Sequence, residues 1–163
     1  MSDTSLDLYL TGLRNQHAVE TQAIGTLQNE MTHTKAYPEL LAKMQVDKDR
    51  STTQAARLDQ LLKKHDTAKS ALKEAVSGAI ATVAGFAHAA SGDDVLRNVL
   101  AAIGFKAYEI ASYKALITLA NAASAGADVP TLEQSMAEEQ EMGDWLGEHL
   151  PSLVTAYLEQ RKA

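Results

Sequence analysis

Two polar residues, His17 and Glu20, interrupt an otherwise apolar pattern near the start of the chain. Steps of three and four residues keep side chains on one stripe of a helix, the stripe that faces a core. This stripe consists of Leu6, Leu10, Leu13, His17, Glu20, Ile24, Leu27 and Met31. A histidine and a carboxylate three residues apart match the spacing of metal ligands on a helix, but a core histidine hydrogen-bonded to Glu20 or to a tyrosine also explains the pair.

Three later segments also carry polar residues in the middle of apolar stripes. The stripe of the second segment reads Leu40, Met44, Asp47, Ser51, Gln54, Leu58 and Leu61. The remaining two segments supply Lys106 with Glu109 and Glu138 with Glu139. A helix rises 1.5 Å per residue, which places Glu20 and Asp47 at similar depth in an antiparallel pair of helices. We therefore expect one polar layer across the middle of a helical protein.

Such a layer needs positive charge, because each unpaired buried carboxylate carries a desolvation penalty of several kcal/mol. Otherwise some of the carboxyl groups must be protonated. A pair of iron or manganese ions held by facing helices is one solution, with one Glu from each of two helices and Glu-x-x-His from the other two. The candidate ligands are His17, Glu20, Asp47, Glu109, Glu138 and Glu139. The ammonium of Lys106 offers another solution, since it can pair with Glu109 and Glu20.

Helices must position these residues, because the chain is rich in strong helix formers and has only three prolines in 163 residues. We expect helices at about residues 5–33, 38–64, 67–90, 93–124 and 130–149, and a short one at 151–161 after a kink or restart at about residues 149–152, where Pro151 removes a backbone donor. Four of them form a bundle of two antiparallel hairpins, and 67–90 is the crossover between the hairpins. Residues 1–163 then form a single domain, and His65, near a helix end, lies at the surface.

Composition excludes several classes of protein. Cysteine is absent, so disulfides, thiolate metal sites and cysteine nucleophiles are excluded. The net charge of −6 argues against a nucleic-acid-binding protein. The first residues show no signal-peptide pattern, and the longest apolar segment is too short to span a membrane. We expect a soluble cytoplasmic protein that binds neither nucleic acid nor membrane.

Motifs along most of the chain resemble those of the YciE/YciF family of ferritin-like proteins. The motifs are AVETQAIGTL (18–27), RLDQLL (57–62), YEIASYKAL (108–116) and AEEQEMGDWL (137–146). The family consists of small bacterial stress-associated proteins with a dimetal-type bundle and no established activity. The resemblance implies an all-α, ferritin-like four-helix bundle with an additional crossover helix. It also implies a homodimer, with metal ligands drawn from core carboxylates and histidines.

This sequence departs from the family where metal would be held. Residues 106–109 read Lys-Ala-Tyr-Glu where the family has Glu-His-Tyr-Glu, and residues 47–50 read Asp-Lys-Asp-Arg where the family has His-x-x-Glu. We therefore expect a structural or binding protein with a lost or crippled dimetal site and no cofactor. Its buried polar network consists of His17, Glu20, Lys106 and Glu109. The alternative is a redox metalloprotein that binds iron or manganese and oxidises Fe(II) or consumes peroxide.

Overall fold

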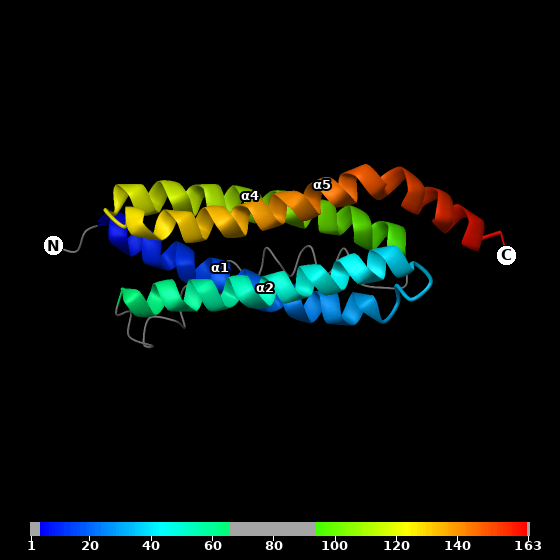
Figure 1. The fold of residues 1–163 in the computed structure, drawn as a ribbon, viewed down its shortest axis with the longest axis horizontal. Helices are drawn as coiled ribbons and strands as arrows, with labels where there is room; N and C mark the ends of the chain where they lie inside the picture. Colours follow the sequence, from blue (N-terminus) through cyan, green and yellow to red (C-terminus); the bar gives the residue numbers. More distant parts are fainter. Residues whose placement is uncertain (1–3, 66–93, 163) are drawn as a thin grey trace.

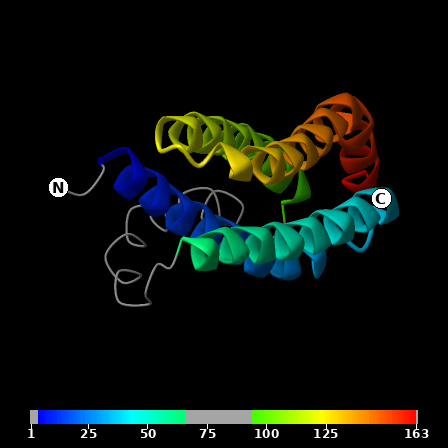
Figure 2. The ribbon, with the colours of Figure 1, turned by 60° about the vertical axis from the view of Figure 1, so that its left-hand side comes forward.

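The computed structural model describes residues 4–65 and 94–162, and nearly all of these residues are helical. The elements are α1 (Thr4–Met31), α2 (Pro38–Lys64), α4 (Val95–Ala122), the 3₁₀ turn η2 (Gly126–Asp128) and α5 (Val129–Gln160). Helices α1 and α2 form one antiparallel pair, and α4 and α5 form the other (Figure 1). The two pairs pack as two layers, with α1 against α4 (Figure 2). The fold is therefore an all-α, ferritin-like four-helix bundle, and the predicted crossover helix at 67–90 lies outside the described residues.

Local sequence signals explain where these helices begin. Pro38 is the first residue of α2, where its fixed φ suits a helix and its missing N–H would have no partner within the helix. The side chain of Asp94 accepts a hydrogen bond of 3.0 Å from the backbone N–H of Arg97 and so caps α4. The bounds of α1, α2 and α4 lie within two residues of those predicted from the sequence.

The prediction of a separate short helix at 151–161 is wrong, because α5 continues through Pro151 to Gln160, but the predicted kink is present as a bend (Figure 1). A proline inside a helix removes one backbone hydrogen bond and crowds the preceding turn, which can bend a helix without ending it. The C-terminal part of α5, red in Figure 1, runs at an angle to the rest of the helix. The hydroxyl of Ser152 donates to the carbonyl oxygen of His149 at 2.8 Å and so supplies a side-chain hydrogen bond near the bend.

The core contains two large apolar clusters with a polar layer between them. Near the N-terminus of α1, one cluster contains Tyr9, Leu13, Leu58, Leu61, Leu62, Tyr113, Leu116, Ala120, Ala125 and Leu132. Near the loop that joins α1 to α2, the other contains Tyr37, Leu40, Met44, Val95, Val99, Met142 and Leu146. Gly12 lets α1 lie close to α4, because a Cβ at this position would be 2.7 Å from Leu116 Cδ2. No described helix is long and apolar enough to cross a membrane.

Candidate functional site

Lys106 lies at the centre of the polar layer, with its side chain only 3% exposed. Its Nζ donates a hydrogen bond of 2.6 Å to Glu139 on α5 and one of 2.9 Å to Asp47 on α2. The same nitrogen lies 2.9 Å from Glu109 Oε2, one turn away on α4. Three carboxyl groups from three helices therefore surround one ammonium, an arrangement of charge-assisted contacts that fixes the helices relative to one another.

The surrounding carboxylates keep this lysine charged. Burial lowers the pKa of Lys106, but the charges of Glu109, Asp47 and Glu139 outweigh burial and hold the pKa well above its usual value. Burial raises the pKa of Glu139, but Lys106 and a hydrogen bond from Glu109 bring the pKa below its usual value. The ion pair at the centre of the layer is therefore Lys106 with ionised Glu139.

Burial disfavours the ionised forms of two other acids of the layer, Glu109 and Asp47. Burial raises the pKa of Glu109 well above its usual value, although Lys106 acts in the opposite direction. With both groups ionised, three oxygens lack a hydrogen-bond partner among the described residues: Oε1 and Oε2 of Glu109, and Oε1 of Glu139. A proton on Glu109 allows this residue to donate a hydrogen bond to Glu139. Burial also raises the pKa of Asp47, and the ammonium of Lys106 only partly offsets this.

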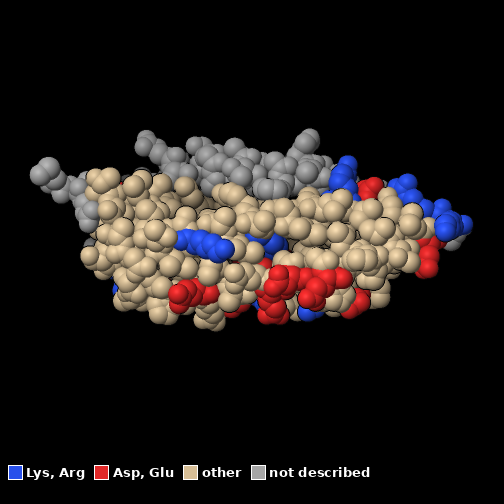
Figure 3. Space-filling view, turned by 90° about the horizontal axis from the view of Figure 1, so that it is seen from above, with Lys and Arg blue, Asp and Glu red and all other residues tan. Residues whose placement is uncertain are grey.

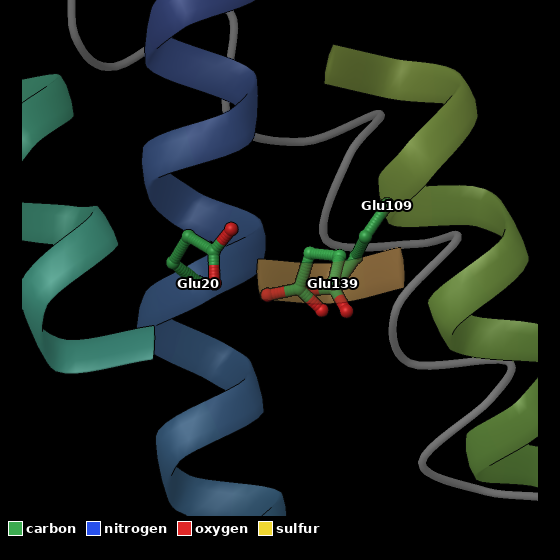
Figure 4. Close-up of side chains that lie close together, drawn as sticks. All are labelled: Glu20, Glu109 and Glu139. Carbon is green, nitrogen blue, oxygen red and sulfur yellow. The ribbon is translucent and has the colours of Figure 1, made fainter. Parts of the chain in front are cut away.

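Glu20 completes the layer from α1 and is fully buried. Its Oε1 accepts hydrogen bonds from Tyr113 Oη at 2.8 Å and from Gln16 Nε2 at 3.0 Å, whereas its Oε2 has no hydrogen-bond partner among the described residues. Burial raises the pKa of Glu20 to about 7, with a further contribution from the charge of Glu139. Figure 4 shows Glu20 facing the adjacent carboxyl groups of Glu109 and Glu139 across the space between the helices.

The structure brings Glu20, Lys106 and Glu109 together but leaves His17 only half-buried. Gln16 takes the place next to Glu20, and its Oε1 accepts a hydrogen bond of 2.6 Å from the Ser112 hydroxyl. The buried stripe of α1 therefore passes through Tyr9, Leu13, Gln16, Glu20, Ala23 and Glu30. Because successive residues lie 100° apart around a helix, a shift of one position moves the imidazole away from the centre of the layer.

Glu138, another candidate ligand from the sequence, is paired elsewhere. The guanidinium of Arg57 donates to both of its oxygens, at 2.7 and 2.9 Å, and Gln54 Nε2 donates to its Oε2 at 3.0 Å. This forked geometry ties α2 to α5 beside the layer and neutralises the charge of Glu138. Glu138 is therefore separate from the carboxyl group of its neighbour Glu139.

The residues present do not fit a dinuclear iron or manganese centre. Among the described residues, Glu20, Glu109 and Glu139 offer oxygens that all lie within 4.8 Å of one another, and no histidine joins them. Dinuclear centres of this fold class need more ligands than three carboxylates. The ammonium of Lys106 also contacts two of these three groups and would repel a second cation there.

A second buried polar cluster surrounds Asp128 at the end of the bundle near the N-terminus. Its side chain is fully buried and accepts hydrogen bonds from Tyr9 Oη at 2.9 Å and from Lys64 Nζ at 2.5 Å. His65 Nε2 lies 2.7 Å from Asp128 Oδ2, and its side chain is only 19% exposed, so the prediction that His65 lies at the surface is wrong. These contacts lower the pKa of Asp128 although burial raises it. The sequence pattern missed this cluster because Asp128 follows a loop and belongs to no helical stripe.

Comparison with known proteins agrees with this fold. Residues 4–159 match the family described as a domain of unknown function, DUF892. The chain belongs to the DUF892 family. The match spans all four described helices of the bundle, so the polar layer lies entirely within the family domain.

Solved structures with the DUF892-type fold come from several bacteria. A protein of Xanthomonas campestris has a TM-score of 0.81 at 24% identity, covering 98% of this chain and 100% of its own. YcfI of Rhodopseudomonas palustris, considered a candidate structural protein, has a TM-score of 0.75 at 25% identity, covering 89% of this chain and 94% of its own. The Escherichia coli stress protein YciF has a TM-score of 0.80 at 20% identity, covering 95% and 99%. The resemblance to the YciE/YciF family is thus confirmed.

Proposed function

We propose that this DUF892 protein is a structural, stress-associated bundle in which the ammonium of Lys106 takes the place of a metal pair. The observation that carries the proposal is the contact of one buried Nζ with Asp47, Glu109 and Glu139 at 2.6 to 2.9 Å. A cation that belongs to the chain cannot be lost by chelation or by a change of redox state. The descriptions of YcfI as structural and of YciF as a stress protein support the same role.

The layer itself suits a structural role. Lys106 joins α2, α4 and α5, and the hydrogen bond from Tyr113 to Glu20 joins α4 to α1. A polar layer of this kind favours one register of the helices, because a slip of one turn would leave buried charges without partners. Polar contacts within the layer therefore join all four described helices of the bundle.

Metal content tests this proposal. Protein produced in medium with iron and manganese should contain far less than one metal ion per chain. Lys106→Glu adds a fifth carboxylate to Glu20, Asp47, Glu109 and Glu139 and removes the ammonium, so this variant should bind metal. Lys114→Glu, an exposed position on the same helix, makes the same charge change and should leave the metal content unchanged. One or more equivalents of iron or manganese in the unmodified protein would overturn the proposal.

A second candidate function is that of a redox protein with a single iron or manganese ion. The observation that favours it is the buried Glu20 Oε2, which has no hydrogen-bond partner among the described residues and lies beside Glu109 and Glu139. These three glutamates would hold the ion, which would supply one-electron chemistry with oxygen or peroxide. One equivalent of metal that disappears in Glu20→Gln would support this function over the structural one.

We also propose a cytoplasmic homodimer, in which the dimer is what the family resemblance implies. The net charge of −6 supports the further proposal that the protein binds no nucleic acid. On the face drawn in Figure 3, the described acidic side chains gather near the middle and basic side chains lie mostly towards one end, so no broad basic surface forms there. Light scattering should give twice the chain mass of 17.5 kDa, and a mass of one chain would contradict the dimer. A gel-shift titration with duplex DNA at low salt should show no complex.

A further inference from the structure

We propose that a small pocket beside Glu30, next to the Lys106 layer and sharing Asp47 with it, binds one hard divalent cation. The pocket has a volume of about 30 Å³ and lies between the end of α1 and the other three helices. A cavity holds one water from about 10–15 Å³ upward, so this space suits an ion that keeps one water. Its polar lining includes the side chains of Glu30, Thr34, Asp47 and Asn98.

Glu30 is the observation that points to a ligand. The residue is only 7% exposed, and its carboxyl group has no hydrogen bond or ion pair among the described residues. A buried carboxylate without a partner is costly, and most buried carboxylates are paired or coordinate metal. Burial raises the pKa of Glu30 to about 7, with a further contribution from the charge of Asp47. The two acids are therefore close enough to interact, and a cation between them would favour both ionised forms.

The chemistry of the lining selects the class of ion. Carboxylate, hydroxyl and amide oxygens are the ligands of hard cations such as Ca²⁺ and Mn²⁺, and the described lining contains no histidine. Asp47 contacts Lys106 through Oδ1 and so joins the pocket to the buried layer. The ammonium of Lys43 also lines the pocket, but its Nζ lies 5.3 Å from the centre of the Trp145 ring, a cation–π contact that holds it to one side.

Methionine methyl groups allow a direct test with Mn²⁺. Met44 and Met142 line the pocket, whereas Met136 packs against the apolar cluster at the other end of the bundle. A bound paramagnetic ion broadens nearby NMR signals most strongly. Titration of ¹³C-methyl-methionine protein with MnCl₂ should therefore broaden Met44 and Met142 before Met136, and Ca²⁺ should compete with the effect.

Variants separate the pocket from the buried layer. Glu30→Gln should lower the apparent affinity for Mn²⁺ about tenfold or more, because it removes one of two charged ligands. The affinity is read from the broadening of the Met44 and Met142 signals. Glu39→Gln, with a side chain 73% exposed on α2, is the matched control and should behave as the unmodified protein. Glu20→Gln should also retain the effect, since Glu20 does not line the pocket. Uniform broadening of all methyls, or selective broadening that survives Glu30→Gln, would overturn the proposal.

Discussion

Replacing Lys106 by methionine should destabilise the protein strongly, because it removes the ammonium and keeps a side chain of similar length. Asp47, Glu109 and Glu139 would then lie in the core with no cation. Glu139 has an ordinary pKa of 4.5, so burying it neutral at pH 7 costs about 3 kcal/mol at about 1.4 kcal/mol per pKa unit. With the lost hydrogen bonds, the total should be about 3–5 kcal/mol, the usual cost of breaking a buried ion pair.

Urea unfolding followed by circular dichroism measures this difference. For a chain of this size, the same loss should lower the melting temperature by about 6–20 °C. Lys63→Met is the matched control, because Lys63 forms an exposed ion pair with Asp59 and its side chain is 73% exposed. This control should cost no more than about 1 kcal/mol.

The pH dependence of the Lys106→Met effect makes the test sharper. The ionised form of Glu139 is stabilised in the native protein, so its contribution is present above pH 4.5 and is lost as the pH falls. At pH 5 the carboxyl group accepts a proton at little cost, and the difference between variant and native protein should shrink by about 2–3 kcal/mol relative to pH 7. A Lys106→Met variant as stable as Lys63→Met at pH 7, or a loss independent of pH, would refute the reasoning.

Three further changes test other parts of the structure. The pKa of Glu30 is raised to about 7, so the stability that its protonation gives is complete below pH 4.5 and is lost as the pH rises through 7. In EDTA, urea unfolding should therefore show Glu30→Gln to be more stable than the native protein at pH 8, by up to about 3 kcal/mol. Near pH 4 the two proteins should be equally stable. Asp128→Asn should lower the free energy of unfolding by about 3 kcal/mol at pH 7, measured in the same way. The pKa of Asp128 is lowered in the native protein, so this difference should vanish as the pH falls below the ordinary Asp value of 3.8. Arg57→Lys, which removes the forked contact with Glu138, should cost about 1 kcal/mol in thermal unfolding, and an unchanged melting temperature would contradict that contact.

The apolar periodicity of two helices was enough to predict their buried faces. On α2 the predicted stripe from Leu40 to Leu61 is buried at each of its positions. On α4 the stripe placed Lys106 and Glu109 in the core, and the structure buries both. Periodicity succeeds here because each stripe is apolar at both ends, which fixes the direction of the polar residues in the middle.

Periodicity failed where polar residues are buried through specific hydrogen bonds. Tyr9 and Gln16 lie in the core of α1 because Asp128 and Glu20 accept their hydrogen bonds, and this shifts the buried stripe away from His17. No pattern within α1 contains that information, since one of the two partners lies more than a hundred residues away along the chain. At Pro151 the sequence predicted a kink or a restart, and packing of Leu150, Leu153 and Tyr157 against the core accompanies a kink within one continuous helix.

The charge of Lys106 is the central claim, and its direct measurement is an NMR titration of the lysine Nζ. Protein labelled with ¹⁵N-lysine, with the Lys106 signal assigned by its absence in Lys106→Met, is followed from pH 6 to about pH 11. We expect Lys106 to remain an ammonium throughout this range, because its pKa lies well above the ordinary lysine value of 10.5. A Lys106 signal that loses its proton below pH 10.5, or that is already neutral at pH 7, would contradict the account.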